Sequence, residues 1–405
     1  MQHPSVRQAI ANRLLAATIL ASAIFVLAFT PEPANAQTYK ILYTLIGGSS
    51  GYSPGDVIVA PNGTIYGTAA YDFGCACNLI FSFANSTFTV LHRWSEPSAH
   101  NPSDPQGLLL NSNATVLYGS EQFGGPTNLN CFPFAGDACG AVFAYKLTAN
   151  TLQEYDFTGT PNGLDPSGTQ VLASGSLYGL TWGGGANGWG SFYRVSLSGQ
   201  EQVLYSFKNS PDGQGPGDGL VPYNGAFYGV TIGGGNTSCP YGCGTIFKIT
   251  PTGSETVLYS FADGPDGRNP YQIVGDGQGN FYGISRNSSN VVVAIFEIKA
   301  SGQFSIAYNG SFVSQIQSII AGPNGSLYGT ASGGNPSCDP NGCGQVFQLM
   351  STGGGNGTVN VLHQFDGTDG ALPQIGSLVL HNGVLVGSTA IGGSTNQGVI
   401  YALKP

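Results

Sequence analysis

Residues 220–261 read LVPYNGAFYGVTIGGGNTSCPYGCGTIFKITPTGSETVLYSF, and variants of this stretch fill most of the chain. Four runs rich in Val, Ile, Leu, Tyr and Phe, which pack well on a pleated surface, divide it: runs i to iv cover 220–223, 226–231, 244–250 and 256–261. Asn224-Gly225 separates the first two runs and signals a β-hairpin, because a type I′ turn needs positive φ at both central residues. We therefore predict a unit of four antiparallel strands.

The core of run ii recurs along the chain as Ile65-Tyr66-Gly67, Leu117-Tyr118-Gly119, Leu177-Tyr178-Gly179, Phe227-Tyr228-Gly229, Phe281-Tyr282-Gly283, Leu327-Tyr328-Gly329 and Leu385-Val386-Gly387. The intervals are 52, 60, 50, 54, 46 and 58 residues. Four strands per unit at a period of about 40–50 residues are typical of β-propeller blades.

The two ends of the repeat region complement each other. The first strand-like run after the N-terminal segment, 40–45, matches run iv, and the last, 398–403, matches run iii. Pairing them completes one blade and leaves no open sheet edge. The predicted fold class is therefore all-β: a seven-bladed β-propeller with four antiparallel strands per blade, its ring closed by the N-terminal strand pairing into the last blade.

Residues 1–36 differ from the repeats. Arg7 and Arg13 precede an apolar run at 14–29, and Ala34-Asn35-Ala36 matches an A-x-A cleavage site. The apolar run is short for a membrane span. We predict a signal peptide cleaved after Ala36, a secreted, extracellular protein with no membrane span in the mature chain, and a single propeller domain over residues 37–405.

The mature chain is acidic. Residues 1–36 hold two of the 12 basic and one of the 21 acidic side chains, which leaves a net charge of 10 − 20 = −10. An acidic, sparsely charged surface disfavours nucleic acid and anionic membranes as partners. We expect a monomer.

Eight cysteines form four local pairs, each between runs ii and iii of one repeat. An even number in an exported chain indicates disulfides, and we predict the bridges Cys131–Cys139, Cys239–Cys243 and Cys338–Cys343. Cys75 and Cys77 stand too close in sequence for a relaxed bridge. Zinc is the rival interpretation, but each pair belongs to a different blade and a zinc site needs about four converging ligands. We predict no metal site.

Antiparallel strands send alternate connections to opposite ends, so the long ii–iii and iv–i loops share one end of the propeller. Binding residues tend to sit on such loops. Trp182, Trp189 and Tyr241 lie in ii–iii loops without recurring, and they are candidates for stacking on sugar rings, with anchoring of the loop as the alternative. Asp212 and Asp266 lie in iv–i loops and are each followed by glycine. They are candidates for ligand binding, with turn formation as the alternative interpretation.

No serine elbow or zinc-protease motif occurs in the sequence. His92 and His363 take the Tyr position of run iv, which indicates a structural role. Four carboxylates lie in or beside run i, and the sequence does not give their separations: Asp104, Asp165, Asp218 and Asp276. We predict no cofactor and favour a protein that is not an enzyme.

The pattern L-Y-G-T-x-x-x-G-G, C-G-x-V-F, V-L-Y-S-F and D-G-x-x-P resembles the GloVer tandem repeat, a family of exported bacterial proteins often described as choice-of-anchor repeat proteins. The match is clearest in 227–261 and 327–347 and weakest at 285–287, where Ser-Arg-Asn replaces the Gly-Gly loop. The resemblance implies export and repeat architecture and carries no activity over. A C-terminal anchor is common in such proteins; because the chain stops at Pro405, we expect a freely secreted form.

Two classes of function remain, because propellers host both. The first, which we favour, is a binding or interaction module for extracellular carbohydrate or a protein partner. The second is a secreted propeller enzyme such as a glycosidase or polysaccharide lyase. Carboxylates about 5–10 Å apart on the long-loop end would favour the enzyme, whereas glycine, aromatic and amide side chains there would favour binding.

Overall fold

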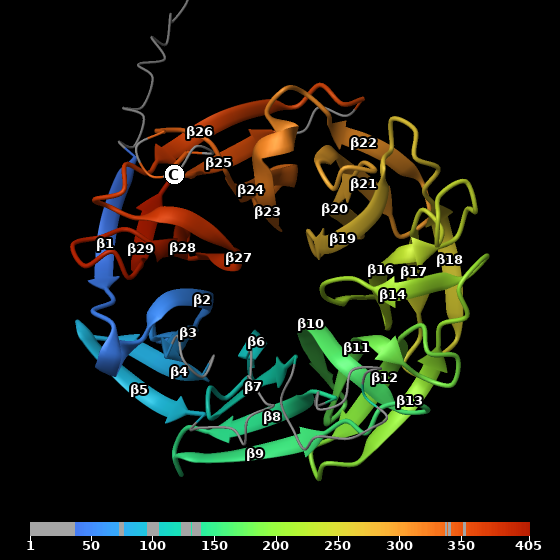
Figure 1. The fold of residues 1–405 in the computed structure, drawn as a ribbon, viewed down its shortest axis with the longest axis horizontal. Helices are drawn as coiled ribbons and strands as arrows, with labels where there is room; N and C mark the ends of the chain where they lie inside the picture. The colour runs from blue at the N-terminus through green and yellow to red at the C-terminus, as the bar shows by residue number, and fades with distance from the viewer. Residues whose placement is uncertain are drawn as a thin grey trace, which may run out of the picture. The chain divides into compact units, whose positions relative to one another are not determined.

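The structure, a computed structural model, describes residues 37–72, 77–94, 105–122, 131, 139–336, 338, 342–350 and 354–405. Within Thr38–Pro405, seven antiparallel sheets stand as blades around a central axis (Figure 1). Each blade has four strands, except that the innermost strand of blade 4 is interrupted and counts as two. The protein is a seven-bladed β-propeller, as the repeat predicts.

From the inner to the outer edge, blades 1 to 3 contain β2 (Tyr52–Val59), β3 (Ile65–Asp72), β4 (Cys77–Ala84), β5 (Thr87–Arg93); β6 (Pro105–Leu110), β7 (Val116–Glu121), β8 (Ala141–Lys146), β9 (Thr151–Asp156); and β10 (Gly163–Ala173), β11 (Ser176–Gly184), β12 (Ser191–Ser196), β13 (Glu201–Ser206). Blades 4 and 5 contain β14 (Gly213–Pro216), β15 (Val221–Tyr223), β16 (Ala226–Gly234), β17 (Thr245–Ile249), β18 (Glu255–Ser260); and β19 (Arg268–Gly275), β20 (Asn280–Arg286), β21 (Val292–Lys299), β22 (Phe304–Tyr308). Blades 6 and 7 contain β23 (Ile316–Ala321), β24 (Ser326–Ala331), β25 (Gln345–Met350), β26 (Thr358–Gln364); and β27 (Ala371–His381), β28 (Val384–Ile391), β29 (Val399–Lys404), β1 (Thr38–Thr44). Three 3-10 turns, η1 (Gly48–Ser50), η2 (Val313–Gln315) and η3 (Pro323–Gly325), complete the elements.

The ring closes as predicted. The N-terminal strand β1 pairs antiparallel with β29, with Tyr39 opposite Leu403 and Tyr43 opposite Ile400. The Tyr39 ring stacks on His363 of the neighbouring blade 6 with centroids 3.8 Å apart, and its hydroxyl donates to the Asp369 carbonyl at 2.6 Å. Chain ends that are distant in sequence therefore share one sheet.

One part of the predicted strand assignment is wrong. We placed the segment after each Asp-Gly or Asn-Gly in a loop, but it begins the innermost strand, as in β10, β14 and β27. Proline is compatible with this position because the innermost strand is a sheet edge, where a missing N–H breaks no ladder hydrogen bond.

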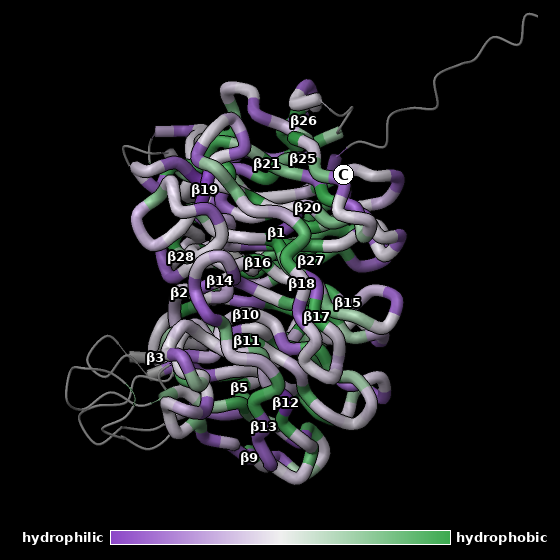
Figure 2. The backbone as a smooth tube through the Cα atoms, turned by 90° about the vertical axis from the view of Figure 1, so that its right-hand side faces the viewer, coloured by the Kyte–Doolittle hydropathy of each residue, from purple (hydrophilic) through white to green (hydrophobic). Residues whose placement is uncertain are grey.

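The core lies between blades. Five of the six tyrosines of the Tyr-Gly pairs are buried and Tyr66 is half-buried; Tyr228 stacks on Phe281 of the next blade with centroids 4.1 Å apart. Figure 2 shows hydrophobic residues along many of the strands and hydrophilic residues in many of the turns. Middle strands such as β8 and β16 are buried along most of their length, because a blade packs against a neighbour on each of its two faces.

A recurring contact joins neighbouring blades at the long-loop end. The Cys243 carbonyl accepts a hydrogen bond from Asn269 N at 2.8 Å, and a Cβ on Gly244 would lie 2.5 Å from Pro270 Cδ. Equivalent main-chain bonds run from Ser53 N to Gln397 O, Asp165 N to Cys139 O, Gly215 N to Trp189 O and Leu372 N to Cys343 O, at 2.8–2.9 Å. The Cys-Gly of one repeat therefore contacts the segment around the proline of the next repeat, and this contact joins the two blades.

Candidate functional site

A pocket of about 190 Å³ opens at the long-loop end, where parts of three blades meet. Blade 3 contributes Trp182, and blade 5 contributes Asn269. Blade 4 contributes the remaining lining residues: Gln214, Gly215, Ile232, Gly233, Pro240, Tyr241 and Gly242. Two of the five predicted ligand residues, Trp182 and Tyr241, therefore line one pocket.

Trp182 forms one aromatic wall. It lies near the end of β11, is 47 % exposed, and its indole packs on the backbone of Gly215, where an added Cβ would lie 3.2 Å from Nε1. Among the hydrogen bonds of the described residues, none involves the Trp182 side chain. An exposed indole face with an available N–H can both stack on a ligand ring and donate a hydrogen bond.

Tyr241 is the second aromatic side chain that lines the pocket, and it is 78 % exposed. The disulfide Cys239–Cys243, with Cα atoms 5.1 Å apart, closes a loop around Pro240, Tyr241 and Gly242. The backbone of Tyr241 has φ 67°, and its carbonyl accepts from Gly234 N at 2.8 Å. The ring is therefore held outward by its backbone.

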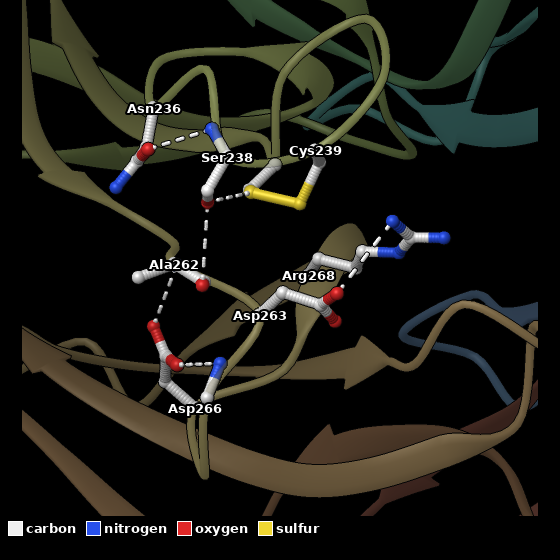
Figure 3. Close-up of a disulfide and its surroundings, with 9 residues drawn as sticks. Asn236, Ser238, Cys239, Ala262, Asp263, Asp266 and Arg268 are labelled. Atoms are coloured by element: carbon white, nitrogen blue, oxygen red, sulfur yellow. Dashed lines mark hydrogen bonds and ion pairs between the residues drawn. A yellow bond between two sulfur atoms is a disulfide. The ribbon is translucent and has the colours of Figure 1, made fainter.

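The disulfide loop is tied to the neighbouring iv–i turn (Figure 3). Ser238 Oγ lies 3.2 Å from Cys243 Sγ and donates to the Ala262 carbonyl at 3.4 Å. Asp266 in turn accepts from Ala262 N at 3.1 Å and from Gly264 N at 3.0 Å. These bonds fix the shape of the loop that presents Tyr241.

Two amides supply polar groups. Gln214 and Asn269 both line the pocket, and the Gln214 side-chain oxygen is buried without a hydrogen-bond partner within the described segments. Unpaired buried polar atoms are uncommon in folded proteins. The pocket thus combines aromatic faces with amide donors and acceptors, the usual composition of a small-molecule site.

The other three predicted residues lie elsewhere. Trp189 is 38 % exposed and does not line the pocket. Asp212 accepts from Tyr205 Oη, Lys208 N and Gly213 N at 2.8, 2.9 and 2.6 Å, and Asp266 accepts from Tyr259 Oη at 3.0 Å besides the bonds above. Both carboxylates are thereby engaged in their own turns, as Asp369 is with His363 at 2.8 Å.

The structure contains the disulfides Cys131–Cys139, Cys239–Cys243 and Cys338–Cys343, with Cα–Cα distances of 4.9, 5.1 and 5.0 Å. Cys75 and Asp104 lie outside the described residues, as does the Cys77 side chain. Where side chains are described, no three His, Cys, Asp or Glu residues gather as metal ligands. None of the helical segments described has the length and apolarity of a membrane span.

A carboxyl pair lies between blades 1 and 2. Glu121, at the end of β7, is 1 % exposed, and its Oε1 has no partner among the described residues. Burial, followed by the charge and hydrogen bond of Glu154, raises the pKa of Glu121 to about 9. Trp94 Nε1 donates to Glu154 Oε1 at 2.9 Å, and Glu154 is exposed. A protonated acid beside an exposed carboxylate is an arrangement that acid–base catalysis uses.

The sequence offered no signal for the pocket's polar side. Gln214 and Asn269 occupy the variable positions of the D-G-x-x-P motif, before its proline, in a segment that we assigned to a loop. Glu121 lies in β7 and Glu154 in β9, on either side of β8. Only the pairing of these strands, with Ala141 opposite both Glu121 and Asp156, brings the two glutamates into the same part of blade 2.

Residues 134–335 match the family described as the Gloeobacter/Verrucomicrobia repeat. No curated protein matches the sequence.

Several solved structures are similar in fold. Virginiamycin B lyase from Staphylococcus aureus is 14 % identical with a TM-score of 0.58, over 91 % of this chain and 99 % of its own. A streptogramin B lyase is 13 % identical with a TM-score of 0.59, over 91 % and 97 %. The β-propeller domain of the Trilobed protease from Pyrococcus furiosus is 8 % identical with a TM-score of 0.52, over 87 % and 95 %. At these identities the likeness concerns the fold alone.

Proposed function

We infer that this chain, a seven-bladed β-propeller that carries the Gloeobacter/Verrucomicrobia repeat, is an exported binding module whose ligand is an extracellular glycan. One observation carries the proposal: exposed Trp182 and disulfide-held Tyr241 line one pocket together with the amides of Gln214 and Asn269.

The composition of the pocket favours a sugar ring. The C–H faces of a pyranose stack on aromatic side chains, and its hydroxyls pair with amides and with the indole N–H. The volume of about 190 Å³ is below the roughly 300–1,000 Å³ of pockets for drug-sized ligands, which fits one ring of a longer chain. The remaining sugars would extend over the exposed loops.

Export is part of the proposal. Three disulfides agree with an oxidising, extracellular location, because such bridges persist there and are rare in the cytosol. Cleavage after Ala36 would release the mature propeller. A protein partner is the alternative ligand for the same surface.

A secreted enzyme is the second candidate, and the pair Glu121 and Glu154 is the observation that favours it. A glycosidase needs two carboxyl groups in different protonation states on either side of the scissile bond. Burial of Glu121 between blades argues for the binding module, because a general acid must reach its substrate.

A glycan-array screen of the purified protein with intact disulfides tests both candidates, followed by product analysis on each hit. A hit without turnover supports the binding module. Turnover that Glu121→Gln abolishes would replace it by the enzyme, and an array without hits would contradict the glycan ligand and leave a protein partner.

A further inference from the structure

The central channel holds a second cavity, distinct from the aromatic pocket, with a volume of about 390 Å³. Its lining comes from the innermost strands. The prolines that begin these strands do not line it, whereas half-buried residues farther along do: Ile58, Val221, Val274 and Ile320. The cavity therefore runs from the middle of the channel toward the short-turn end, opposite the long loops.

Polar bonds link neighbouring inner strands around the channel. Asp56 Oδ2 accepts from Gly107 N at 2.6 Å, and Gln272 Oε1 accepts from Ile319 N at 3.0 Å. Further inter-blade bonds run from Gln106 Nε2 to Pro166 O, Ser167 Oγ to Gly217 O, Asp218 N to Tyr271 O and Ser388 Oγ to Gly55 O. Most of the residues that line the cavity are aliphatic.

Asp218 stands out among the polar residues that line the cavity. It lies where the innermost strand of blade 4 is interrupted, between β14 and β15, and it lines the cavity. Its carboxylate makes no hydrogen bond or ion pair with any residue that the structure describes, while Asp56 and Gln272 are both bonded. Two described lining residues are acidic and none is basic.

The backbone holds this carboxylate in place. Gly168 of blade 3 has φ 64°, and an added Cβ there would collide with Asp218 Oδ1 and Gly219 N. The surrounding protein raises the pKa of Asp218 to about 6 by desolvation, so the group is mostly ionised at pH 7.5. An unpaired negative charge in a cavity with low-dielectric walls attracts cations more strongly than one in open water.

We propose that the channel cavity binds a small amphiphilic amine, whose ammonium group pairs with Asp218 and whose hydrocarbon body packs against aliphatic residues such as Leu220, Ile273 and Ile319. The occupant follows from charge complementarity. The carboxylates repel an anion, a neutral alcohol leaves the charge of Asp218 uncompensated, and a fully hydrated cation makes no use of the aliphatic walls.

Isothermal titration calorimetry at pH 7.5 tests the proposal with three probes of equal length: n-hexylammonium, hexanol and hexanoate. Hexylammonium, protonated at this pH like a lysine side chain, is expected to bind at least tenfold more tightly than hexanol, and hexanoate is expected not to bind. Lengthening the amine from butyl to hexyl should tighten binding about fourfold per CH₂, from about 0.8 kcal/mol per buried methylene.

Asp218→Asn keeps the shape of the side chain and removes its charge. This variant should lose at least tenfold in hexylammonium affinity without changing hexanol binding. Asp263→Asn, at an exposed turn on the long-loop end, serves as the matched control and should leave both affinities unchanged. Equal affinities for hexylammonium and hexanol, an Asp218→Asn variant that binds the amine normally, or no binding of any amine would each overturn the proposal.

Discussion

Gly229 lies directly opposite Phe247 in the β16–β17 ladder, and a Cβ on Gly229 would stand 2.5 Å from Phe247 Cζ. The aromatic ring therefore covers the glycine and fills the space of the missing side chain. The same pairing recurs as Gly67–Phe81, Gly119–Phe143, Gly179–Tyr193, Gly283–Phe296 and Gly329–Phe347. The glycine of each Tyr-Gly pair is required by the ring opposite it and not by a turn.

Gly229→Ala should destabilise the protein by about 1–3 kcal/mol, the usual range for an overpacked core. Urea unfolding measures the change. Gly264→Ala is the control, because its nearest neighbour, Asp266 Oδ1, lies 3.2 Å from the added Cβ and can shift. In a Phe247→Leu background the cost of Gly229→Ala should shrink, and equal costs in both backgrounds would refute the steric explanation.

Replacing both Cys239 and Cys243 by alanine should cost about 2 kcal/mol of stability, from the entropy of closing a five-residue loop. Because this loop presents Tyr241, glycan affinity should fall as well. The pair Cys338 and Cys343 bridges the equivalent loop of blade 6 over a sequence separation of 5. Its removal should cost similar stability and leave glycan binding unchanged; a similar loss of binding in both variants would show that the effect is global.

Ring closure gives another prediction. Tyr39→Ala removes the stacking on His363 and the bond to the Asp369 carbonyl, whereas Tyr39→Phe removes the bond alone. Tyr39→Phe should cost about 1 kcal/mol in urea unfolding, and Tyr39→Ala should cost distinctly more. Equal costs would mean that the stacking of Tyr39 on His363 contributes nothing to holding β1 against blade 6.

The raised pKa of Glu121, about 9 against an ordinary 4.5, predicts a pH dependence. Between these values Glu121 holds a proton in the folded protein that it releases in the unfolded chain. Its contribution to the free energy of unfolding is therefore complete below about pH 4.5 and is lost as the pH rises through 9. This group can lower stability by up to about 1.4 kcal/mol per pH unit in that range.

Glu121→Gln stays neutral and should flatten the decline in unfolding free energy between pH 5 and pH 9. Glu297→Gln, a half-buried glutamate of β21, is the control and should leave the slope unchanged. A Glu121→Gln slope equal to that of the natural protein would contradict the buried, protonated state.

The architecture could be predicted because the signals for it are local and repeated. Asn224-Gly225 turns, run ii and run iii recur at a propeller period, and the unmatched ends at 40–45 and 398–403 indicated the pairing of β1 with β29. The start of the innermost strand could not be predicted, because Asp-Gly followed by Pro has the composition of a turn. Its strand pairing depends on β16, farther along the chain.

The candidate site could be predicted only in part. Exposed aromatic residues that break the repeat indicated Trp182 and Tyr241, but not that blades 3 and 4 place them around one pocket. Asp212 and Asp266 recur at equivalent positions, which in a repeat protein is more typical of a structural bond than of a ligand contact. Asp218 differs from them because no partner group accompanies it, and only the structure displays that.

The most direct measurement is the affinity of the best array glycan for four proteins: the natural chain, Trp182→Ala, Tyr241→Ala and Trp189→Ala. We predict a loss of about 5- to 150-fold for the first two variants, from about 1–3 kcal/mol for an aromatic stacking contact. Trp189→Ala, an exposed tryptophan outside the pocket lining, should change affinity by less than about threefold. Equal affinities in all four proteins, or a larger loss in Trp189→Ala than in the other two, would contradict the glycan site between Trp182 and Tyr241.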